Sequence, residues 1–215
     1  MSKQKCTEFL LVVGISGVTC GGKTTTAKKL RAMLPKATII SQDDYFLSED
    51  DPRHIWIPEL NHANWDVITS LDMERMYRDI STLLKNDSSR RVTHKFQKIR
   101  KPVHDINYIC DILKTAKLKV IIVEGFCIFN YKPLLQFFDL MYYFTLTKEE
   151  CFERRELRTY DPPDCPGYFD LCAWPEHLSQ LEEVRKTVDG IKFCSGKADV
   201  VEDILRDIFF LYSSI

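Results

Sequence analysis

A run of residues near the amino terminus matches the phosphate-loop pattern G-x-x-x-x-G-K-S/T without a mismatch. Its members are Gly17, Val18, Thr19, Cys20, Gly21, Gly22, Lys23 and Thr24. The continuous apolar run 9–13 before the loop is typical of a buried strand, and residues 23–34 after it are expected to form a helix. Glycines permit the positive φ angles through which backbone N–H groups converge on phosphate oxygens, and the helix directs its positive dipole end at the same anion. The sequence therefore predicts a strand, a loop and a helix that together bind a nucleotide.

The rest of the chain alternates short apolar runs with longer helical patterns, which predicts an α/β fold with a parallel sheet flanked by helices. The further strands are expected at 37–40, 119–123, 140–146 and 191–194. At 215 residues the chain has the length of a single domain spanning 1–215. Helix starts are indicated by capping-box spacing at Thr147 to Glu150 and at Asp199 to Glu202, and by Pro175 in a first turn.

Composition excludes several classes of protein. Hydrophobic residues make up 45% and charged residues 28% of the chain, with a net charge of −1, so it is neither disordered nor broadly basic. We therefore expect no nucleic-acid partner and no attraction to an anionic membrane. The longest apolar stretch, 9–15, is too short to span a bilayer. The eight cysteines are scattered without a CxxC pair, which favours reduced thiols in a cytoplasmic protein.

Two segments interrupt the alternation of strands and helices. Residues 48–64 are polar and contain proline, so we expect a surface flap after the second strand. Residues 86–107 form a basic insertion with little periodicity, which favours a solvated surface insertion over a nucleic-acid patch because no aromatic ladder accompanies the charge. Neither segment has the features of a domain boundary.

Carboxylates at strand ends are the candidates for phosphoryl-transfer chemistry. Glu124 follows the strand 119–123 directly, which places it at the sheet edge where ligands bind and where it could approach Mg²⁺. Asp43 and Asp44 end the second strand, and position alone does not choose between them. The guanine motif N-K-x-D does not occur, which favours ATP over GTP. A small-molecule kinase is the class that remains.

An arginine-rich helix and a proline-rich loop follow the fourth strand. Arg154 and Arg158 share one helix face, whereas Arg155 is rotated from them by about 100°. This spacing could direct two guanidinium groups to ATP and one to the acceptor, although such helices are often paired with their own acids. Residues 160–174 contain several prolines and aromatic side chains, which indicates a defined lid.

Five blocks together resemble the nicotinamide riboside kinases, a family of uridine-kinase-like P-loop kinases. They are Gly14-Ile-Ser-Gly-Val-Thr, Ile40-Ser-Gln-Asp-Asp, Ile122-Val-Glu-Gly-Phe126, Phe129-Asn-Tyr-Lys-Pro133 and the lid with Pro-Pro-Asp, Pro-Gly-Tyr-Phe-Asp and Trp-Pro. The resemblance implies a three-layer P-loop kinase fold with a lid and a surface insertion. It also implies transfer of the ATP γ-phosphoryl group to the 5′-hydroxyl of nicotinamide riboside, which forms the mononucleotide for NAD synthesis.

The resemblance assigns roles to individual residues. Asp43 aligns with the general base, Lys23 with the lysine that bridges the phosphates, and Arg155 with an arginine at the acceptor. The Mg²⁺ site would comprise Thr24, Asp43 and Glu124. The ATP site would comprise the phosphate loop with Thr25, Arg154, Arg158 and Lys197, and the acceptor site would comprise Asp43, Phe46, Trp65, Asp66, Arg155, Tyr160 and Asp161.

The sequence departs from the family pattern at three places. Trp65 stands where the family typically has tyrosine, Asp161 replaces a neutral polar residue, and the insertion 86–107 is longer and more basic. An aromatic face suits a cationic ring, and the charge of Asp161 would favour one as well.

Alternatives stay open at this point. They are a uridine- or cytidine-type nucleoside kinase, a nucleotide-binding interaction protein without turnover, and an RNA-binding module built on the basic insertion. By resemblance we expect a monomer. Acceptance of GTP or of nicotinic acid riboside is not determined by these residues.

Overall fold

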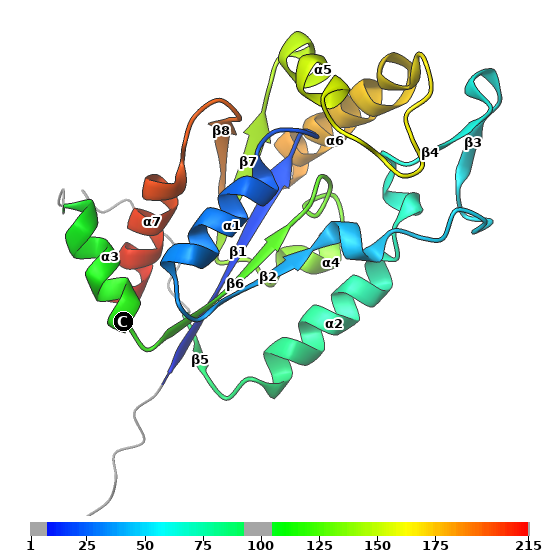
Figure 1. The fold of residues 1–215 in the computed structure, drawn as a ribbon. Helices are drawn as coiled ribbons and strands as arrows, with labels where there is room; N and C mark the ends of the chain where they lie inside the picture. Colours follow the sequence, from blue (N-terminus) through cyan, green and yellow to red (C-terminus); the bar gives the residue numbers. More distant parts are fainter. Residues whose placement is uncertain (1–7, 93–104, 215) are drawn as a thin grey trace, which may run out of the picture.

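The computed structural model describes residues 8–92 and 105–214, and its centre is a parallel β-sheet (Figure 1). The strands lie in the order β2-β6-β1-β7-β8, and every neighbouring pair is parallel. Their bounds are β1 Phe9–Gly17, β2 Ala37–Ser41, β6 Leu118–Glu124, β7 Leu140–Thr145 and β8 Ile191–Ser195. Each of the strands predicted from an apolar run is present. All five therefore end at the same edge of the sheet.

The side chains of β1 point alternately to the two faces of the sheet and so divide the core into two layers. Leu11, Val13 and Ile15 pack on one face of the sheet, whereas Leu10 and Val12 pack on the other, because successive side chains of a strand point to opposite faces. The first face is covered by α1 (Lys23–Met33), α3 (Ile106–Thr115) and α7 (Val201–Ser213). The second is covered by α2 (Met73–Asn86), α4 (Lys132–Leu135) and α6 (Trp174–Thr187). This confirms the predicted three-layer α/β fold.

One of the two predicted capping boxes is present. At the start of α5 (Lys148–Glu156), Glu150 N–H donates to Thr147 Oγ1 at 3.3 Å and Thr147 N–H donates to Glu150 Oε2 at 3.1 Å. Pro175 lies in the first turn of α6, as predicted. The box at Asp199 is wrong: α7 is capped by Val200, while Asp199 pairs with Lys29 at 2.6 Å. Because α7 begins at Val201, Glu202 is its second residue and not its third, and Asp199 Oδ1 accepts the Val201 N–H at 3.2 Å.

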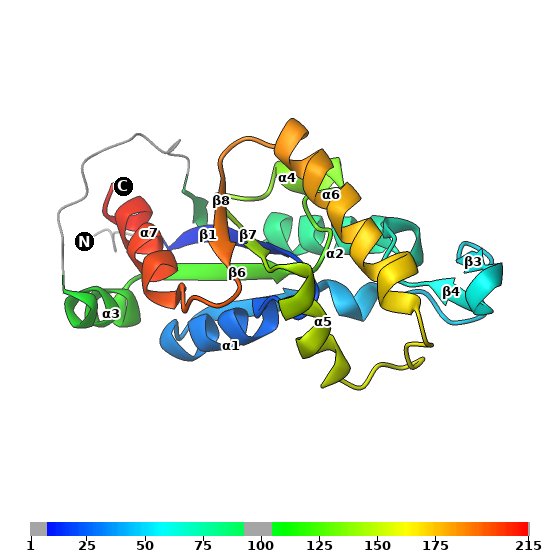
Figure 2. The ribbon, with the colours of Figure 1, turned by 90° about the horizontal axis from the view of Figure 1, so that it is seen from above.

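The flap at 48–64 contains a short antiparallel hairpin. It consists of β3 (Ile55–Ile57) and β4 (His62–Asn64), joined by a 3₁₀ turn at Pro58–Leu60. The hairpin and α3 lie at opposite ends of the molecule in both views (Figures 1 and 2).

The described part of the basic insertion is attached to the sheet, whereas 93–104 lies outside the described residues. Its short strand β5 (Arg90–Arg91) pairs with Phe9 and Leu10 at the beginning of β1, before the residues of β1 that pair with β7. Arg91 donates to Asp139 Oδ1 at 2.9 Å, and Asp139 Oδ2 accepts the Val12 N–H at 2.7 Å. Across 8–92 and 105–214, no helix has the length and apolar character needed to cross a membrane.

Candidate active site

The phosphate loop connects the end of β1 to the start of α1. Gly17 and Gly22 have φ angles of +122° and +92°, and a Cβ at Gly17 would lie 2.2 Å from the Phe144 carbonyl oxygen. Cys20 also adopts a left-handed conformation, with φ of +57°, which is uncommon for a residue with a side chain. The loop therefore has the local backbone that an anion-binding turn requires.

A phosphate cavity of about 350 Å³ opens beside this loop. Its walls are Cys20, Gly21, Gly22, Lys23, Thr24, Thr25, Lys28, Arg154 and Arg158. Lys23 is buried, and its Nζ donates to the Val18 carbonyl at 2.8 Å. Burial lowers the pKa of Lys23, and the charges of Glu124 and Asp43 oppose that shift. The concentration of positive charge at a helix N-terminus suits a polyphosphate.

The predicted nucleotide arginines reach the loop, but Lys197 does not. Arg154 Nη1 donates to the carbonyls of Cys20 and Gly196, both at 3.1 Å. Arg158 Nη1 lies 3.8 Å from Cys20 Sγ. Lys197 pairs with Glu150 and lies in the wall of neither this cavity nor the next one described. Its role at the nucleotide stays a prediction.

Glu124 ends β6 at the sheet edge beside the phosphate loop. Its side chain is 2% exposed, and Thr24 Oγ1 lies 3.1 Å from both of its carboxylate oxygens. Ser41 Oγ donates to the same carboxylate at 2.8 Å. This set of oxygen donors fits a hard cation such as Mg²⁺, which prefers oxygen ligands and retains phosphate and water ligands. Within 8–92 and 105–214 no group of three or more His, Cys, Asp or Glu residues is arranged to hold a metal ion.

A central cavity of about 250 Å³ joins the phosphate loop to the acids and aromatic side chains. It is lined by every residue predicted for catalysis, for the metal and for the acceptor: Lys23, Thr24, Asp43, Phe46, Trp65, Asp66, Glu124, Arg155, Tyr160 and Asp161. Thr19, Cys20, Phe126, Arg158 and Thr159 complete the wall. Residues that are widely separated in the sequence therefore meet in one space.

The 3₁₀ turn at Gln42–Tyr45 separates the two candidate aspartates. Asp43 lines the central cavity, whereas the Asp44 carbonyl accepts a hydrogen bond from Arg75 at 2.5 Å and Asp44 is not in the cavity wall. Gln42 anchors the turn to the segment after β6, because its buried Oε1 accepts the Cys127 N–H at 3.1 Å. This geometry favours Asp43 over Asp44 for chemistry in the cavity.

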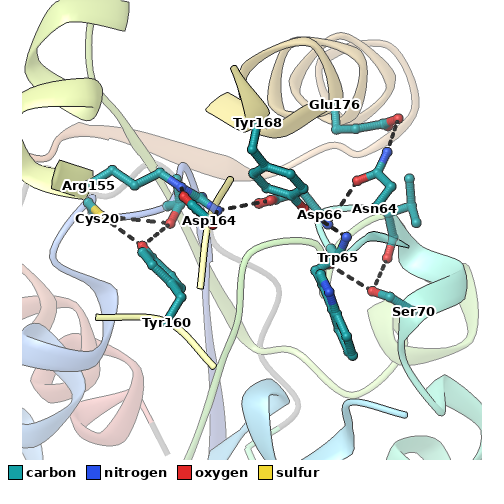
Figure 3. Close-up of polar contacts among 12 residues, drawn as sticks. Cys20, Asn64, Trp65, Asp66, Ser70, Arg155, Tyr160, Asp164, Tyr168 and Glu176 are labelled. Atoms are coloured by element: carbon teal, nitrogen blue, oxygen red, sulfur yellow. Dashed lines mark hydrogen bonds and ion pairs between the residues drawn. The ribbon is translucent and has the colours of Figure 1, made fainter. Parts of the chain in front are cut away.

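Arg155 is held between two carboxylates at the wall of the central cavity (Figure 3). Its side chain is 6% exposed, and it donates to Asp164 through Nε at 2.5 Å and Nη2 at 3.0 Å. Nη2 also lies 3.3 Å from Asp66 Oδ2. Burial opposes the positive charge, but the hydrogen bonds to Asp164 and the charge of Asp66 outweigh it and raise the pKa of Arg155. The guanidinium is therefore a fixed cation.

Asp66 itself is fixed by its backbone. Its N–H donates to Asn64 Oδ1 at 3.1 Å, and Gln180 Nε2 of α6 donates to its carbonyl at 2.6 Å. Asn64 Nδ2 in turn donates to Glu176 at 3.2 Å (Figure 3). The fully buried Tyr168 accepts the Trp65 N–H at 2.8 Å. Burial, with the negative charge of Asp66 next, raises the pKa of Tyr168.

Aromatic rings form another part of the central cavity wall. The Trp65 ring contacts Phe46, with centroids 5.9 Å apart, and His54, with centroids 4.3 Å apart. Tyr160 lies with its ring 4.5 Å from the Arg155 guanidinium, and its hydroxyl is 3.4 Å from Cys20 Sγ (Figure 3). Burial is the largest cause of a rise in the pKa of Tyr160 to about 12. These faces suit a flat, cationic ring.

The sequence interpretation did not assign Gln42, Asn64, Asp164, Tyr168 or Gln180 to the site. Asp164 and Tyr168 belong to the lid block that carries the family resemblance, so a signal for them was present without a role. Gln180 carries no such signal, because its hydrogen bond to Asp66 connects residues 114 positions apart.

Proteins of similar sequence identify the family of this chain. No protein-family model matches the chain. Nicotinamide riboside kinase 1 of Rattus norvegicus is 35% identical over 200 residues, which cover 92% of this chain and 93% of that protein. Nicotinamide riboside kinase 2 of Mus musculus is 35% identical over 204 residues, covering 92% and 95%. A solved structure described as a possible uridine kinase from Bacillus stearothermophilus covers 86% of this chain and 89% of its own, at 19% identity and a TM-score of 0.45. The chain belongs to the nicotinamide riboside kinase family.

Proposed function

We propose that this protein transfers the γ-phosphoryl group of ATP to the 5′-hydroxyl of nicotinamide riboside, giving the mononucleotide used in NAD synthesis. The observation that carries this proposal is the central cavity, in which the phosphate loop, four carboxylates and several aromatic side chains share one space. Those carboxylates are Asp43, Asp66, Glu124 and Asp161. Membership of the nicotinamide riboside kinase family supports the choice of acceptor.

In the proposed reaction the acceptor's 5′-oxygen bonds to the γ-phosphorus while the bond to the β–γ bridging oxygen breaks, and ADP leaves. The acceptor's hydroxyl proton passes to Asp43, which lines the cavity near the phosphate loop. Lys23 and Arg158 face the same cavity and would neutralise charge on the phosphoryl oxygens. Thr24 and Glu124 would hold Mg²⁺, which supplies further neutralisation when it is bound.

Recognition of the acceptor is proposed to have two parts. Asp66 and Arg155 would bind the ribose hydroxyls, since a carboxylate accepts and a guanidinium donates hydrogen bonds. Phe46, Trp65 and Tyr160 would hold the pyridinium ring, whose positive charge favours an aromatic face by about 1–2 kcal/mol once desolvated.

We further propose that the enzyme uses ATP as donor and acts as a monomer in the cytoplasm. Each of the seven cysteines in the described residues is a free thiol, as a reducing compartment would maintain. Size-exclusion chromatography with light scattering tests the oligomeric state directly, and a mass of twice 25.2 kDa would contradict it.

The decisive experiment measures initial rates with Mg²⁺-ATP against nicotinamide riboside, nicotinic acid riboside, uridine and cytidine. We expect the pyridine ribosides to have the highest kcat/KM. Higher values for the pyrimidine nucleosides would retain the phosphoryl-transfer chemistry but replace the acceptor. Binding of ATP without turnover of any acceptor would instead favour a nucleotide-binding interaction protein.

A further inference from the structure

The strongest partner of Arg155 is a lid residue with no role in the reaction as proposed so far. Asp164 contacts Nε at 2.5 Å and Nη2 at 3.0 Å, whereas Asp66 has one contact at 3.3 Å. A carboxylate that contacts two adjacent N–H groups forms a bidentate pair, which is both stronger and more strictly oriented than a single contact. Asp164 therefore controls the orientation of the guanidinium (Figure 3).

The surroundings of Arg155 keep its plane in place. The Tyr160 ring lies 4.5 Å and the Tyr168 ring 5.4 Å from the guanidinium carbon. Its side chain is only 6% exposed, so the loss of a partner would leave its charge largely buried. A buried guanidinium that loses one carboxylate will pair more fully with the nearest remaining one, since an unpaired buried charge is costly. That carboxylate is Asp66.

The position of Asp66 allows it to form a fuller ion pair with Arg155. Its backbone is fixed by Asn64 and Gln180, so the loss of Asp164 would leave it in place. Its side chain is 15% exposed at the cavity wall and touches Arg155 only through Oδ2. A full bidentate pair with Arg155 would occupy both carboxylate oxygens, and these are the atoms that accept hydrogen bonds from an incoming hydroxyl.

We propose that Asp164 is a positioning residue: it holds Arg155 through the Nε and Nη2 edge and thereby keeps the Asp66 carboxylate available to the hydroxyl groups of the acceptor's ribose. The inference rests on the proposed function only in requiring a riboside as acceptor. It explains why an acid of the lid reaches into the site, and it connects the lid segment 160–174 to acceptor affinity.

The test compares steady-state kinetics of the wild type with Asp164→Asn and Asp164→Glu. Asp164→Asn is expected to raise KM for nicotinamide riboside about 10- to 100-fold, the usual effect of losing hydrogen bonds to a charged group. KM for ATP should stay within about twofold, and Asp164→Glu should recover part of the affinity because it restores the charge. The matched control is Asp170→Asn, since Asp170 belongs to the same lid but pairs with Lys148 at 2.7 Å.

A double-substitution cycle separates positioning from a structural contribution to the lid. If Asp164 acts through Asp66, Asp164→Asn should add no more than about twofold to KM in an Asp66→Asn background. Additive effects would overturn the proposal, as would an unchanged KM for the riboside or an equal rise in KM for ATP. Thermal midpoints are measured for every variant. If Asp164→Asn does not fold, Asp164→Glu carries the test, and an unchanged riboside KM in that variant overturns the proposal.

Failure of the proposed function would be visible separately. If the wild type phosphorylates uridine rather than nicotinamide riboside, the assigned acceptor is wrong. Uridine carries the same ribose, so the role of Asp164 is then tested by measuring the same double-substitution cycle with uridine.

Discussion

Thr24 Oγ1 lies 3.1 Å from both carboxylate oxygens of Glu124, although 100 positions separate the two residues in the chain. One follows the lysine of the phosphate loop and the other ends β6, the strand that pairs with β1. The contact shows how a parallel sheet brings a hydroxyl and a carboxylate together at the edge where strands end. It also defines where a cation would meet the phosphates.

Glu124→Gln should therefore impair the use of Mg²⁺. The substitution keeps the side-chain shape but removes the charge that a hard cation needs. We expect kcat to fall about 10- to 100-fold and the Mg²⁺ concentration for half-maximal rate to rise about tenfold, as is usual for weakened metal sites. Titration of the rate with Mg²⁺ measures both. Glu149→Gln, an exposed acid in the first turn of α5, is the control, and an unchanged Mg²⁺ requirement would contradict the assignment.

Asp43→Asn should abolish most turnover while ATP affinity stays within about threefold, because an amide cannot take the acceptor's proton. A general base contributes about 10²- to 10⁴-fold, and kcat should fall by that amount. Asp44→Asn is the neighbouring control, since Asp44 does not line the central cavity. Single-turnover rates and equilibrium ATP binding are the measurements. Comparable losses in the two variants would remove Asp43 from the role of base.

Asp161→Asn should change selectivity between ribosides. Asp161 lines the central cavity together with Trp65 and Tyr160. A negative charge there favours a cationic ring that bears a neutral amide over one that bears a carboxylate. We expect the ratio of kcat/KM for nicotinamide riboside to that for nicotinic acid riboside to fall about three- to tenfold in the variant, with less effect at high salt. A ratio that does not change would mean that Asp161 does not contact the ring.

Alkylation of Cys20 should weaken ATP binding. Its thiol is half-buried in the phosphate cavity, where an added group would occupy the space for phosphate oxygens. Treatment with iodoacetamide should raise the Kd for ATP at least about tenfold, which corresponds to 1.4 kcal/mol. Cys20→Ser should be resistant and Cys165→Ser should remain sensitive. If alkylated wild type binds ATP normally, the loop tolerates the added group and the prediction fails.

His177 should make the folded state less stable in acid. Its ring is buried near Tyr143 and Trp174, and burial, with the charges of Lys23 and Arg185, lowers its pKa to about 4. Since the unfolded chain has the higher pKa, it binds the proton first as pH falls from about 6.5 to about 4. The free energy of unfolding should decrease through that range, by about 3 kcal/mol in full. In urea unfolding at several pH values, His177→Phe should reduce the change in the free energy of unfolding with pH. The same pH dependence in the variant and the wild type would contradict the prediction.

The local features of this chain could be predicted from its sequence. The buried strand, the glycine-rich loop and the helix of the phosphate site follow from apolar runs and from positions where only glycine tolerates the backbone, both of which act over a few residues. The capping box at Thr147 is equally local, and it is present. The box predicted at Asp199 is wrong because α7 is capped by Val200, one residue later, which places Glu202 one position too early in the helix.

Tertiary structure decided which groups meet. Asp43 rather than Asp44 lines the central cavity because a 3₁₀ turn anchored by Gln42 orients the pair. Likewise, the sequence placed Arg155 near the acceptor, but only the packed lid pairs it with Asp164. Arg155 and Asp164 are only nine residues apart, but their hydrogen bond depends on how the lid loop folds back against α5, and residue spacing alone does not set that geometry.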